Sequence, residues 1–276
     1  MPTTTDNLDY FLNDSIPNRV DLLDNRTRYW INDDDHTNFI NNQPNPYNID
    51  SITYRFNEKG FRSDSFTEPA DKKIIFIGCS MTEGIGLPKE ETWSYILLDL
   101  IKKETGLIIP YWNLGMAGCG LDSITRISYN YFNVLTPNLV FGFFPVYRRE
   151  FKSENGWNVA TPSRNLKIYE NNPILIEEQT IKYETEKNLV MIDLILQKYN
   201  STLIWDHWDQ SGIFPVTIEK KLKNFNNRVN AYKKLLFLAK NPPFARDAKH
   251  PGKDFNKQFA LQIFEEKRDV ILTALS

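Results

Sequence analysis

Lys73-Ile-Ile-Phe-Ile-Gly78, followed directly by Cys79 and Ser80, is the stretch of this 276-residue chain that decides its fold. Four consecutive apolar residues ending in a glycine are typical of a strand that is buried on both faces, as strands of parallel sheets are. Residues 88–104, a little further on, carry apolar side chains at helical spacing and predict an amphipathic helix. A buried strand that leads into a helix is the beginning of a βα architecture.

The same alternation continues towards the C-terminus. We predict further strands at residues 107–114, 139–144, 202–206 and 234–239, and further helices at residues 122–134, 175–199, 218–230 and 253–275. Strands that alternate with helices predict an α/β fold, with a central, mostly parallel, five-stranded sheet covered on both faces. This domain occupies residues 71–276, and the polar stretch at residues 150–175 is interpreted as a lid or insertion.

Residues 1–70 have a different character. They are rich in Asn and Asp, yet they carry scattered aromatic residues, and so much apolar surface is costly to leave in water. We therefore expect an N-terminal extension that wraps around the main domain, with a short strand near residues 52–56. The run Asp33-Asp-Asp-His36 is interpreted as a solvated loop.

Composition excludes several classes of function. The formal charge is −2, which gives no electrostatic reason to bind nucleic acid. No apolar run approaches the roughly 18 residues of a membrane span, and the first residues do not resemble a secretory signal. The two cysteines form no disulfide framework, which favours a reducing compartment. The sequence thus predicts a soluble cytoplasmic protein, and it carries no signal of an oligomeric state.

Ser80 is the first candidate for chemistry. It directly follows the strand at residues 73–78, and ligands of open parallel sheets bind outside the carboxyl ends of the strands. A serine hydroxyl becomes a nucleophile when a base takes its proton, and the base needs a third group to orient it. Taken alone, Ser80 is better explained as an ordinary serine of a βα loop.

Two other segments supply the missing partners at the same sheet edge. Asp247-Ala-Lys-His250 lies between the strand predicted at residues 234–239 and the last helix, and its alternative is a solvated loop. The glycine-rich segment at residues 112–120 follows the second strand, and its backbone N–H groups could face a developing oxyanion. Its alternative is a loop that only needs positive φ angles.

These segments resemble the sequence blocks of the SGNH, or GDSL, hydrolases. Residues 77–84 resemble the first block, with Cys79 where the family usually has Asp. Residues 113–118 are similar to the second block and residues 247–250 to the fifth, so the resemblance spans residues 72–276. The glycine-flanked serine motif of the α/β-hydrolase fold is not found in the sequence.

The resemblance implies a flavodoxin-like, three-layer α/β/α sandwich and ester hydrolysis by a triad of Ser80, His250 and Asp247. It also implies an oxyanion hole to which Gly118 contributes, with Gly115 as the fallback. Neither a metal nor an organic cofactor is expected.

One block departs from the pattern of the family. After its third strand the family usually has Gly-x-Asn-Asp, whose Asn donates to the oxyanion, whereas residues 139–149 contain neither Asn nor Asp. Tyr147 or Arg148 stands at about that place. Either side chain could replace the donor or bind an anionic group of the substrate. The alternative is an absent donor and a weakened or inactive enzyme.

The run that begins at Asp206 follows the fourth predicted strand at the same edge. His207 and Trp208 could line a substrate pocket, and Trp205 and Trp208 could stack on a sugar. The run offers too few ligands for a metal site. Cys79 is a second possible nucleophile, but the serine explains the histidine better.

The sequence therefore predicts a serine esterase that removes a short acyl group from a small molecule, such as acetate from a carbohydrate. Two alternatives stay open. The same triad can transfer the acyl group to a sugar if a lid excludes water. A catalytically silent module, used for binding or assembly, is compatible with the departure after the third strand.

Overall fold

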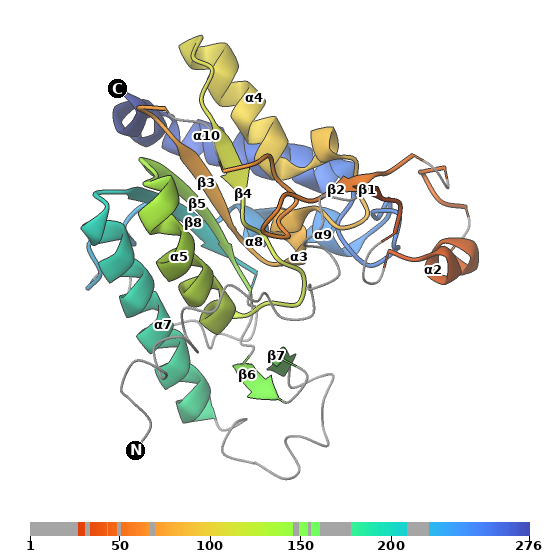
Figure 1. Cartoon of the computed structure of the whole chain (residues 1–276). Coiled ribbons are helices and arrows are strands. Elements are labelled where there is room, and N and C mark those ends of the chain that lie inside the picture. The colour runs from red at the N-terminus through yellow and green to blue at the C-terminus, as the bar shows by residue number, and fades with distance from the viewer. Residues whose placement is uncertain are drawn as a thin grey trace.

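The computed structural model describes residues 27–30, 34–42, 44–48, 51–66, 70–145, 149–153, 156–160, 178–208 and 221–276. A central sheet forms the middle layer of the molecule, with helices on both faces (Figure 1). Within the described ranges, none of the helices is long and apolar enough to cross a membrane.

The central sheet is parallel and has four strands in the order β4-β3-β5-β8. The strands are β3 (Ile74–Gly78), β4 (Tyr111–Asn113), β5 (Leu139–Phe144) and β8 (Thr202–His207). The predicted α/β fold with a parallel central sheet is therefore confirmed. The strand predicted at residues 107–114 begins later than expected, because Pro110 has no N–H to donate to a neighbouring strand.

The predicted fifth strand is wrong. Except for Leu235, which lies between them, residues 234–239 belong to two short helices, α8 (Ala231–Lys234) and α9 (Leu236–Lys240). The segment consists of Leu, Ala, Lys and Phe without a β-branched residue, and its leucines and alanine favour a helix.

The helix predicted at residues 218–230 is also wrong over its described part, residues 221–230, which contains only turns and an isolated bridge. The backbone of Trp205 in β8 makes two hydrogen bonds with this segment. Its N–H donates to the Asn227 carbonyl (3.4 Å), and its carbonyl accepts from the Val229 N–H (2.8 Å). The parallel bridge between Trp205 and Arg228 covers the outer edge of β8. Backbone bonds to a sheet edge here take the place of a helical ladder.

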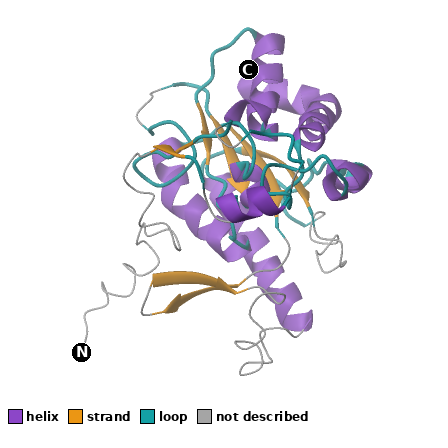
Figure 2. Ribbon diagram, turned by 90° about the vertical axis from the view of Figure 1, so that its right-hand side faces the viewer, coloured by secondary structure: helices purple, strands orange, loops and turns teal. Residues whose placement is uncertain are grey.

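Each face of the sheet carries two long helices (Figures 1 and 2). α4 (Trp93–Thr105) and α10 (Lys253–Leu275) pack together on one face, and α5 (Leu121–Leu135) and α7 (Glu178–Lys198) on the other. Thr92 caps the start of α4, because its side chain accepts from the Tyr95 N–H, and the left-handed Gly106 caps its end. A single-turn 3₁₀ helix at Lys89–Glu91 precedes it, which explains why the predicted helix began too early.

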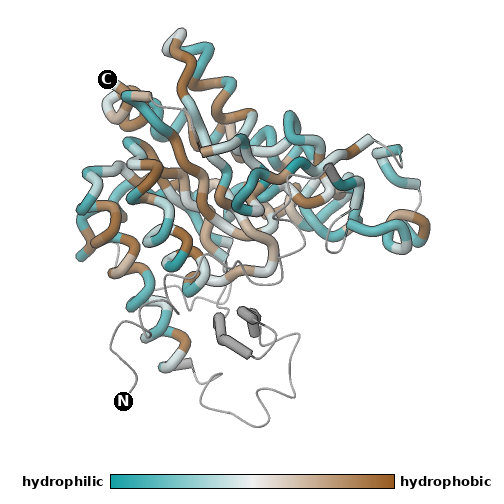
Figure 3. The backbone as a smooth tube through the Cα atoms, in the orientation of Figure 1, coloured by the Kyte–Doolittle hydropathy of each residue, from teal (hydrophilic) through white to brown (hydrophobic). Residues whose placement is uncertain are grey.

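β3 shows why the sheet needs cover on both sides. Ile75 and Ile77 belong to the apolar cluster under α5 and α7, whereas Ile74 and Phe76 belong to the cluster under α4 and α10. All four side chains are fully buried, and the strand is hydrophobic along its length (Figure 3). Because side chains alternate along the strand, β3 contributes to two separate hydrophobic cores, one on each face of the sheet.

The described N-terminal residues pack on this sandwich. β1 (Thr27–Arg28) pairs antiparallel with β2 (Tyr54–Arg55), and α2 (His36–Asn41) lies between them in the chain. Residues 52, 54 and 56 form a small buried cluster with Ile85 of the main domain. His36 is exposed, as the interpretation of a solvated segment expected, but it opens a helix and does not lie in a loop. Asp34, in the same run, is fully buried and contradicts that interpretation.

β6 (Arg149–Ser153) and β7 (Gly156–Ala160) form an antiparallel hairpin that follows β5 in the chain. Apart from Arg149, the hairpin lies within residues 150–175, the stretch interpreted as a lid or insertion, and residues 154–155 and 161–175 of that stretch lie outside the described residues.

Candidate active site

Ser80 stands at the carboxyl edge of the sheet. It is the first residue of the short helix α3 (Ser80–Glu83), which begins two residues after the last residue of β3. β3 has β4 on one side and β5 on the other, so the strand order reverses direction at this strand. Open α/β sheets bind ligands at such a switch point.

Gly78 lets the chain turn sharply from β3 into α3. A Cβ at this position would lie 2.1 Å from Thr82 Oγ1 and 2.7 Å from the carbonyl oxygen of Phe143 in the neighbouring strand. Both distances are too short for any real carbon contact, so only glycine allows α3 to fold back against the sheet. Ser80 is thereby fixed to the end of the strand with its side chain nearly buried.

Asp247 and His250 lie in the loop between α9 and α10. The loop is closed by an N–H of Ala245 that donates to the His250 carbonyl (2.9 Å) and by an antiparallel bridge between Phe244 and Pro251. The compact loop brings two residues three positions apart to face each other.

The three predicted side chains form one hydrogen-bonded chain. His250 Nε2 lies 2.7 Å from Ser80 Oγ, and His250 Nδ1 contacts Asp247 Oδ2. Asp247 Oδ1 accepts from the backbone N–H groups of Lys249 (3.1 Å) and His250 (3.0 Å). The side chain of Asp247 is 0% exposed and that of His250 is 19% exposed. A serine, a base and a buried carboxylate therefore meet within hydrogen-bond reach.

The carboxyl of Asp247 is held in its ionised form. Burial by itself raises its pKa, but the hydrogen bond and charge of the His250 ring and the two backbone N–H groups outweigh this effect. The net pKa of Asp247 lies below its ordinary value. An ionised carboxylate can accept the Nδ1 proton and so leave Nε2 as the acceptor towards Ser80.

The loop after β4 borders the same place. The Met116 N–H donates to the Gly78 carbonyl (3.1 Å), and Cys119 Sγ contacts that carbonyl (3.2 Å). Ala117 N–H donates to Glu83 Oε2 (2.6 Å), at the far end of α3. The loop is thus attached to both ends of the segment that carries the candidate serine.

The two candidate glycines of this loop differ. The Gly115 N–H donates to Asn113 Oδ1 (2.8 Å), and a Cβ there would lie 2.5 Å from the backbone nitrogen of Glu83. Gly118 has a φ of +81°, a Cβ there would meet nothing within 4 Å, and its N–H has no acceptor among the described residues. Gly115 therefore serves close packing, whereas Gly118 keeps a donor available.

Cys79, the residue before the serine, is buried, and its Sγ lies 3.9 Å from Ser80 Oγ. The imidazole of His250 contacts the serine hydroxyl.

His207 and Trp208 come at the end of β8, two strands away from β3 at the same edge. His207 Nε2 contacts the Arg228 guanidinium, and Trp208 is partly buried against both cores. Trp205 is only 1% exposed, so the interpretation that it stacks on a sugar is wrong. Its apolar ring is needed in the core under the sheet.

Asp206 is a buried carboxyl at the same strand end. It accepts from the N–H groups of His207 (2.8 Å) and Tyr232 (2.8 Å), and burial nevertheless raises its pKa from 3.8 to about 7. No group of metal-ligating side chains occurs among the described residues. Tyr147 and Arg148 lie outside the described residues, so their role as replacement donors stays a prediction.

The sequence analysis missed a buried cluster next to the candidate triad. Arg246, which precedes Asp247, forms an ion pair with Asp34, and Tyr54 also contacts Asp34. Nothing local in the sequence signals this cluster, because Asp34 and Arg246 are 212 positions apart.

Comparison with known proteins adds information about the fold. No protein-family model matches the chain, and no curated protein is significantly similar in sequence. The structure is similar to the psychrotrophic esterase EstA from Pseudoalteromonas sp., with a TM-score of 0.51 and 14% identity over 73% of this chain and 100% of that chain. TesA gives a TM-score of 0.51 and 10% identity over 72% of this chain and 99% of that chain.

A protein described as a GDSL-like lipase from Parabacteroides merdae gives a TM-score of 0.48 and 13% identity over 74% of this chain and 99% of that chain. At such identities a likeness shows the fold. The chain therefore has the α/β/α fold of EstA and TesA, in agreement with the fold that the motif resemblance implies.

Proposed function

We propose that this protein is a GDSL-type serine hydrolase that cleaves a short-chain acyl ester. Ser80 is the nucleophile, His250 is the general base and Asp247 orients the imidazole. The observation that carries the proposal is the continuous contact from the buried Asp247 carboxylate through His250 to Ser80 Oγ, which lies 2.7 Å from His250 Nε2. The nucleophile and base are thus within the distance that proton transfer requires.

In the first half of the reaction, Ser80 Oγ attacks the ester carbonyl carbon while its proton passes to His250 Nε2. The tetrahedral intermediate then collapses, the bond to the alcohol oxygen breaks, and His250 gives its proton to the leaving alcohol. In the second half, a water molecule loses a proton to His250 and attacks the acyl group on Ser80. The acid is released, and the proton returns to Ser80 Oγ.

The negative charge on the carbonyl oxygen needs donors that are already in place. Ser80 occupies the first position of α3, where a backbone N–H has no partner within the helix. The N–H of Gly118 is available as well, and the loop that carries it is attached to Gly78 and Glu83 on either side of the serine. We propose that these two N–H groups hold the oxyanion.

O-acetyl groups of carbohydrates are the first substrates that we propose. Trp208 is partly exposed at the carboxyl end of β8, and an aromatic ring there offers a face to the apolar side of a sugar. Acyl transfer to a sugar acceptor uses the same triad, and product analysis with an added acceptor sugar separates transfer from hydrolysis.

A fluorophosphonate probe tests the proposal without knowledge of the substrate, because it reacts with activated serines. EstA is inhibited by monoethylphosphonate, a related phosphorus reagent. We expect the wild-type protein to be labelled and to hydrolyse p-nitrophenyl acetate, and Ser80→Ala to lose both properties while keeping its fold. Ser128→Ala is the matched control, because Ser128 is a buried serine whose hydroxyl has no partner among the described residues.

Wild-type protein that is neither labelled nor active on p-nitrophenyl esters of any chain length would refute the esterase proposal and favour the silent binding module. Labelling that persists in Ser80→Ala would assign the activity to another residue.

A further inference from the structure

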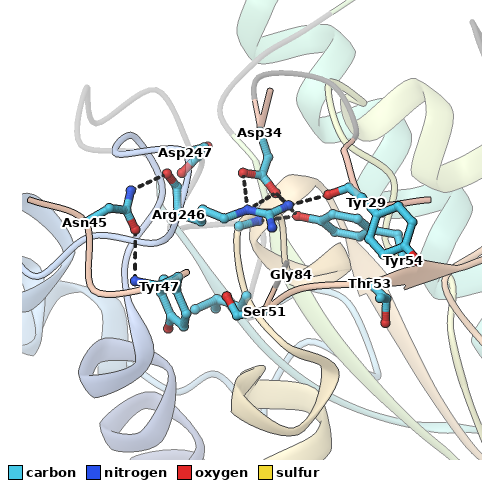
Figure 4. Close-up of polar contacts among 12 residues, drawn as sticks. Tyr29, Asp34, Asn45, Tyr47, Ser51, Thr53, Tyr54, Gly84, Arg246 and Asp247 are labelled. Carbon is cyan, nitrogen blue, oxygen red and sulfur yellow. Dashed lines mark hydrogen bonds and ion pairs between the residues drawn. The ribbon is translucent and has the colours of Figure 1, made fainter. Parts of the chain in front are cut away.

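A buried cluster joins the N-terminal segment to the loop of the proposed triad (Figure 4). Arg246 Nε donates to Asp34 Oδ1 (3.0 Å), and Arg246 Nη2 donates to Asp34 Oδ2 (2.8 Å) and to the Tyr29 carbonyl. The guanidinium carbon lies 4.0 Å from the centroid of the Trp30 ring. Both side chains of the ion pair are 0% exposed.

Such a pair needs an explanation other than stability. Removing two charges from water costs several kcal/mol per ion, so a buried ion pair is often no more stable than apolar residues in its place. This costly ion pair lies directly beside the proposed triad, because Arg246 is the residue before Asp247. What the pair supplies is a fixed position for Arg246.

The backbone of Arg246 is held as firmly as its side chain. Its N–H donates to the Gly86 carbonyl (2.8 Å), and its carbonyl accepts from Asn45 Nδ2 (2.7 Å), as Figure 4 shows for the Asn45 contact. Arg246 is therefore fixed from three directions, two of which come from the N-terminal segment. A residue fixed in this way also fixes the backbone of Asp247, which follows it.

Tyr54 connects this cluster to the serine side of the site. Its hydroxyl accepts from the Gly86 N–H (2.7 Å) and donates to Asp34 Oδ2 (2.5 Å). Burial and the charge of Asp34 raise the pKa of Tyr54 well above its ordinary value, so the phenol keeps the proton that it donates. One hydroxyl thus joins the segment after α3 to the carboxylate that holds Arg246.

Gly86 lies in direct contact with the loop of the triad. A Cβ at Gly86 would lie 2.7 Å from the Ala245 Cβ and 3.1 Å from Asp247 Oδ1. Arg62 holds the same segment from the other side, because its guanidinium donates to the carbonyls of Gly84 (2.6 Å) and Leu87 (2.8 Å). Residues 84–87 are therefore held between the N-terminal segment and the loop at residues 245–247.

We propose that Asp34, Tyr54 and Arg246 are positioning residues, through which the N-terminal segment sets the distance between His250 Nε2 and Ser80 Oγ. The inference rests on the proposed function of Ser80, His250 and Asp247. Proton transfer requires a separation of about 2.6–3.2 Å, and a displacement of about 1 Å can cost 10²-fold in rate. A small shift of the loop therefore reaches the chemistry without any of the three residues touching the substrate.

Tyr54→Phe is the test, because it removes one oxygen atom and keeps the buried ring. We expect kcat for p-nitrophenyl acetate to fall at least about tenfold, with KM within about twofold of wild type. The rate of fluorophosphonate labelling should fall by a similar factor, because the same base activates the serine. A residue with a merely structural role would lower Tm and leave these rates unchanged below Tm.

Tyr47→Phe is the matched control. Tyr47 lies in the same N-terminal segment, and its hydroxyl donates to Glu91 Oε2 (2.6 Å), which belongs to the 3₁₀ helix before α4. The same chemical change there removes a comparable hydrogen bond but spares Gly86, Asp34 and Arg246. We expect Tyr47→Phe to retain wild-type kcat and labelling.

Asp34→Asn and Asp34→Glu test the positioning role independently of Tyr54. The amide removes the charge that Arg246 faces, whereas Glu restores it, so we expect Asp34→Asn to lower kcat and Asp34→Glu to recover part of the loss. All rates are compared below the Tm of each variant, and if Asp34→Asn does not fold, Tyr54→Phe decides.

Wild-type and Tyr54→Phe proteins that are labelled at equal rates, with equal kcat, would overturn the positioning role and leave the proposed esterase intact. Wild-type protein that is not labelled at all would overturn both.

Discussion

At the scale of a single residue, Asp247 combines burial with a negative charge. It is fully buried and yet ionised, and its charge faces the imidazole of His250. We expect Asp247→Asn to lower kcat for p-nitrophenyl acetate by roughly 10⁴-fold, the size of effect seen when the acid of a Ser-His-Asp triad becomes an amide that favours the wrong tautomer. Steady-state kinetics measure the loss, and circular dichroism confirms that the variant is folded. A variant with more than a tenth of wild-type kcat would remove Asp247 from the proposed mechanism.

The buried carboxyls Asp247 and Asp206 should affect stability in opposite directions. The lowered pKa of Asp247 means that its ionised form contributes stability above the unfolded-state pKa of about 3.9, and that this contribution is lost as the pH falls through the native pKa. Asp206 has a native pKa of about 7, raised by burial, so the native state binds its proton more tightly than the unfolded state does. Its contribution therefore decreases as the pH rises from about 4 to about 7.

Urea unfolding of Asp206→Asn and wild-type protein at about pH 5 and pH 8 measures this effect. The free energy of unfolding of wild type should fall relative to that of the variant as the pH rises. A difference that stays constant between the two pH values would show that Asp206 is ionised across the whole range.

The candidate site could be predicted from the sequence only where its residues are tied to strand and helix ends. Ser80 comes two residues after a strand that its apolar run identifies, so it could be assigned to the carboxyl edge of the sheet. Residues 247–250 were assigned to that edge from a strand predicted at residues 234–239, which is a pair of short helices, although the long helix that follows them was predicted correctly. Asp34 and Arg246 could not be paired in this way. Their proximity follows from the path of the N-terminal segment, which no local pattern encodes.

At the scale of an element, the loop after β4 is held against α3 by a glycine. The Cβ of Gly115→Ala would lie 2.5 Å from the Glu83 nitrogen, a backbone atom that cannot move aside. We expect this variant to lose about 1–3 kcal/mol of unfolding free energy and to lose labelling, because the displaced loop carries the N–H of Gly118 away from the serine.

Gly106→Ala is the control for Gly115→Ala. Gly106 has a φ of +69°, but nothing lies within 4 Å of its would-be Cβ. This variant carries only the strain of a left-handed alanine, about 1–2 kcal/mol, and should keep full labelling. Equal labelling of the two variants would show that the loop after β4 supplies no donor to the oxyanion.

The strands and helices were predictable to different degrees for physical reasons. β3 and β5 are continuous apolar runs with β-branched and aromatic residues, and α10 is long enough for its periodicity to show. Residues 234–239 form an apolar run too short to distinguish a strand from a helix by pattern. Tertiary hydrogen bonds determine the conformation of residues 221–230. Backbone contacts with Trp205 at the edge of β8 take the place of a helix there.

At the scale of the whole molecule, the N-terminal segment contributes to the main hydrophobic core. Phe61 is fully buried in the cluster under α5 and α7, and its ring meets Tyr131 edge-on at 5.2 Å. We expect Phe61→Ala to lower the free energy of unfolding by about 3–5 kcal/mol, measured by denaturant titration.

Phe237→Ala makes the same change on the surface, where the side chain is 73% exposed. It should alter the free energy of unfolding by no more than about 0.5 kcal/mol. A Phe61→Ala variant as stable as Phe237→Ala would mean that the segment containing Phe61 adds nothing to the stability of the core.

Asp34 and Arg246 stand 212 positions apart, and this separation orders events during synthesis. The ribosome synthesises the carboxylate of Asp34 well before the guanidinium of Arg246 that neutralises it. Closing so long a loop costs entropy before any contact repays it, and topologies of high contact order fold slowly. A nascent chain that stops before Arg246 has no partner with which to bury Asp34. The proposed esterase activity should therefore appear only once Arg246 has been synthesised and has reached Asp34, which is later than the four strands of the central sheet are synthesised.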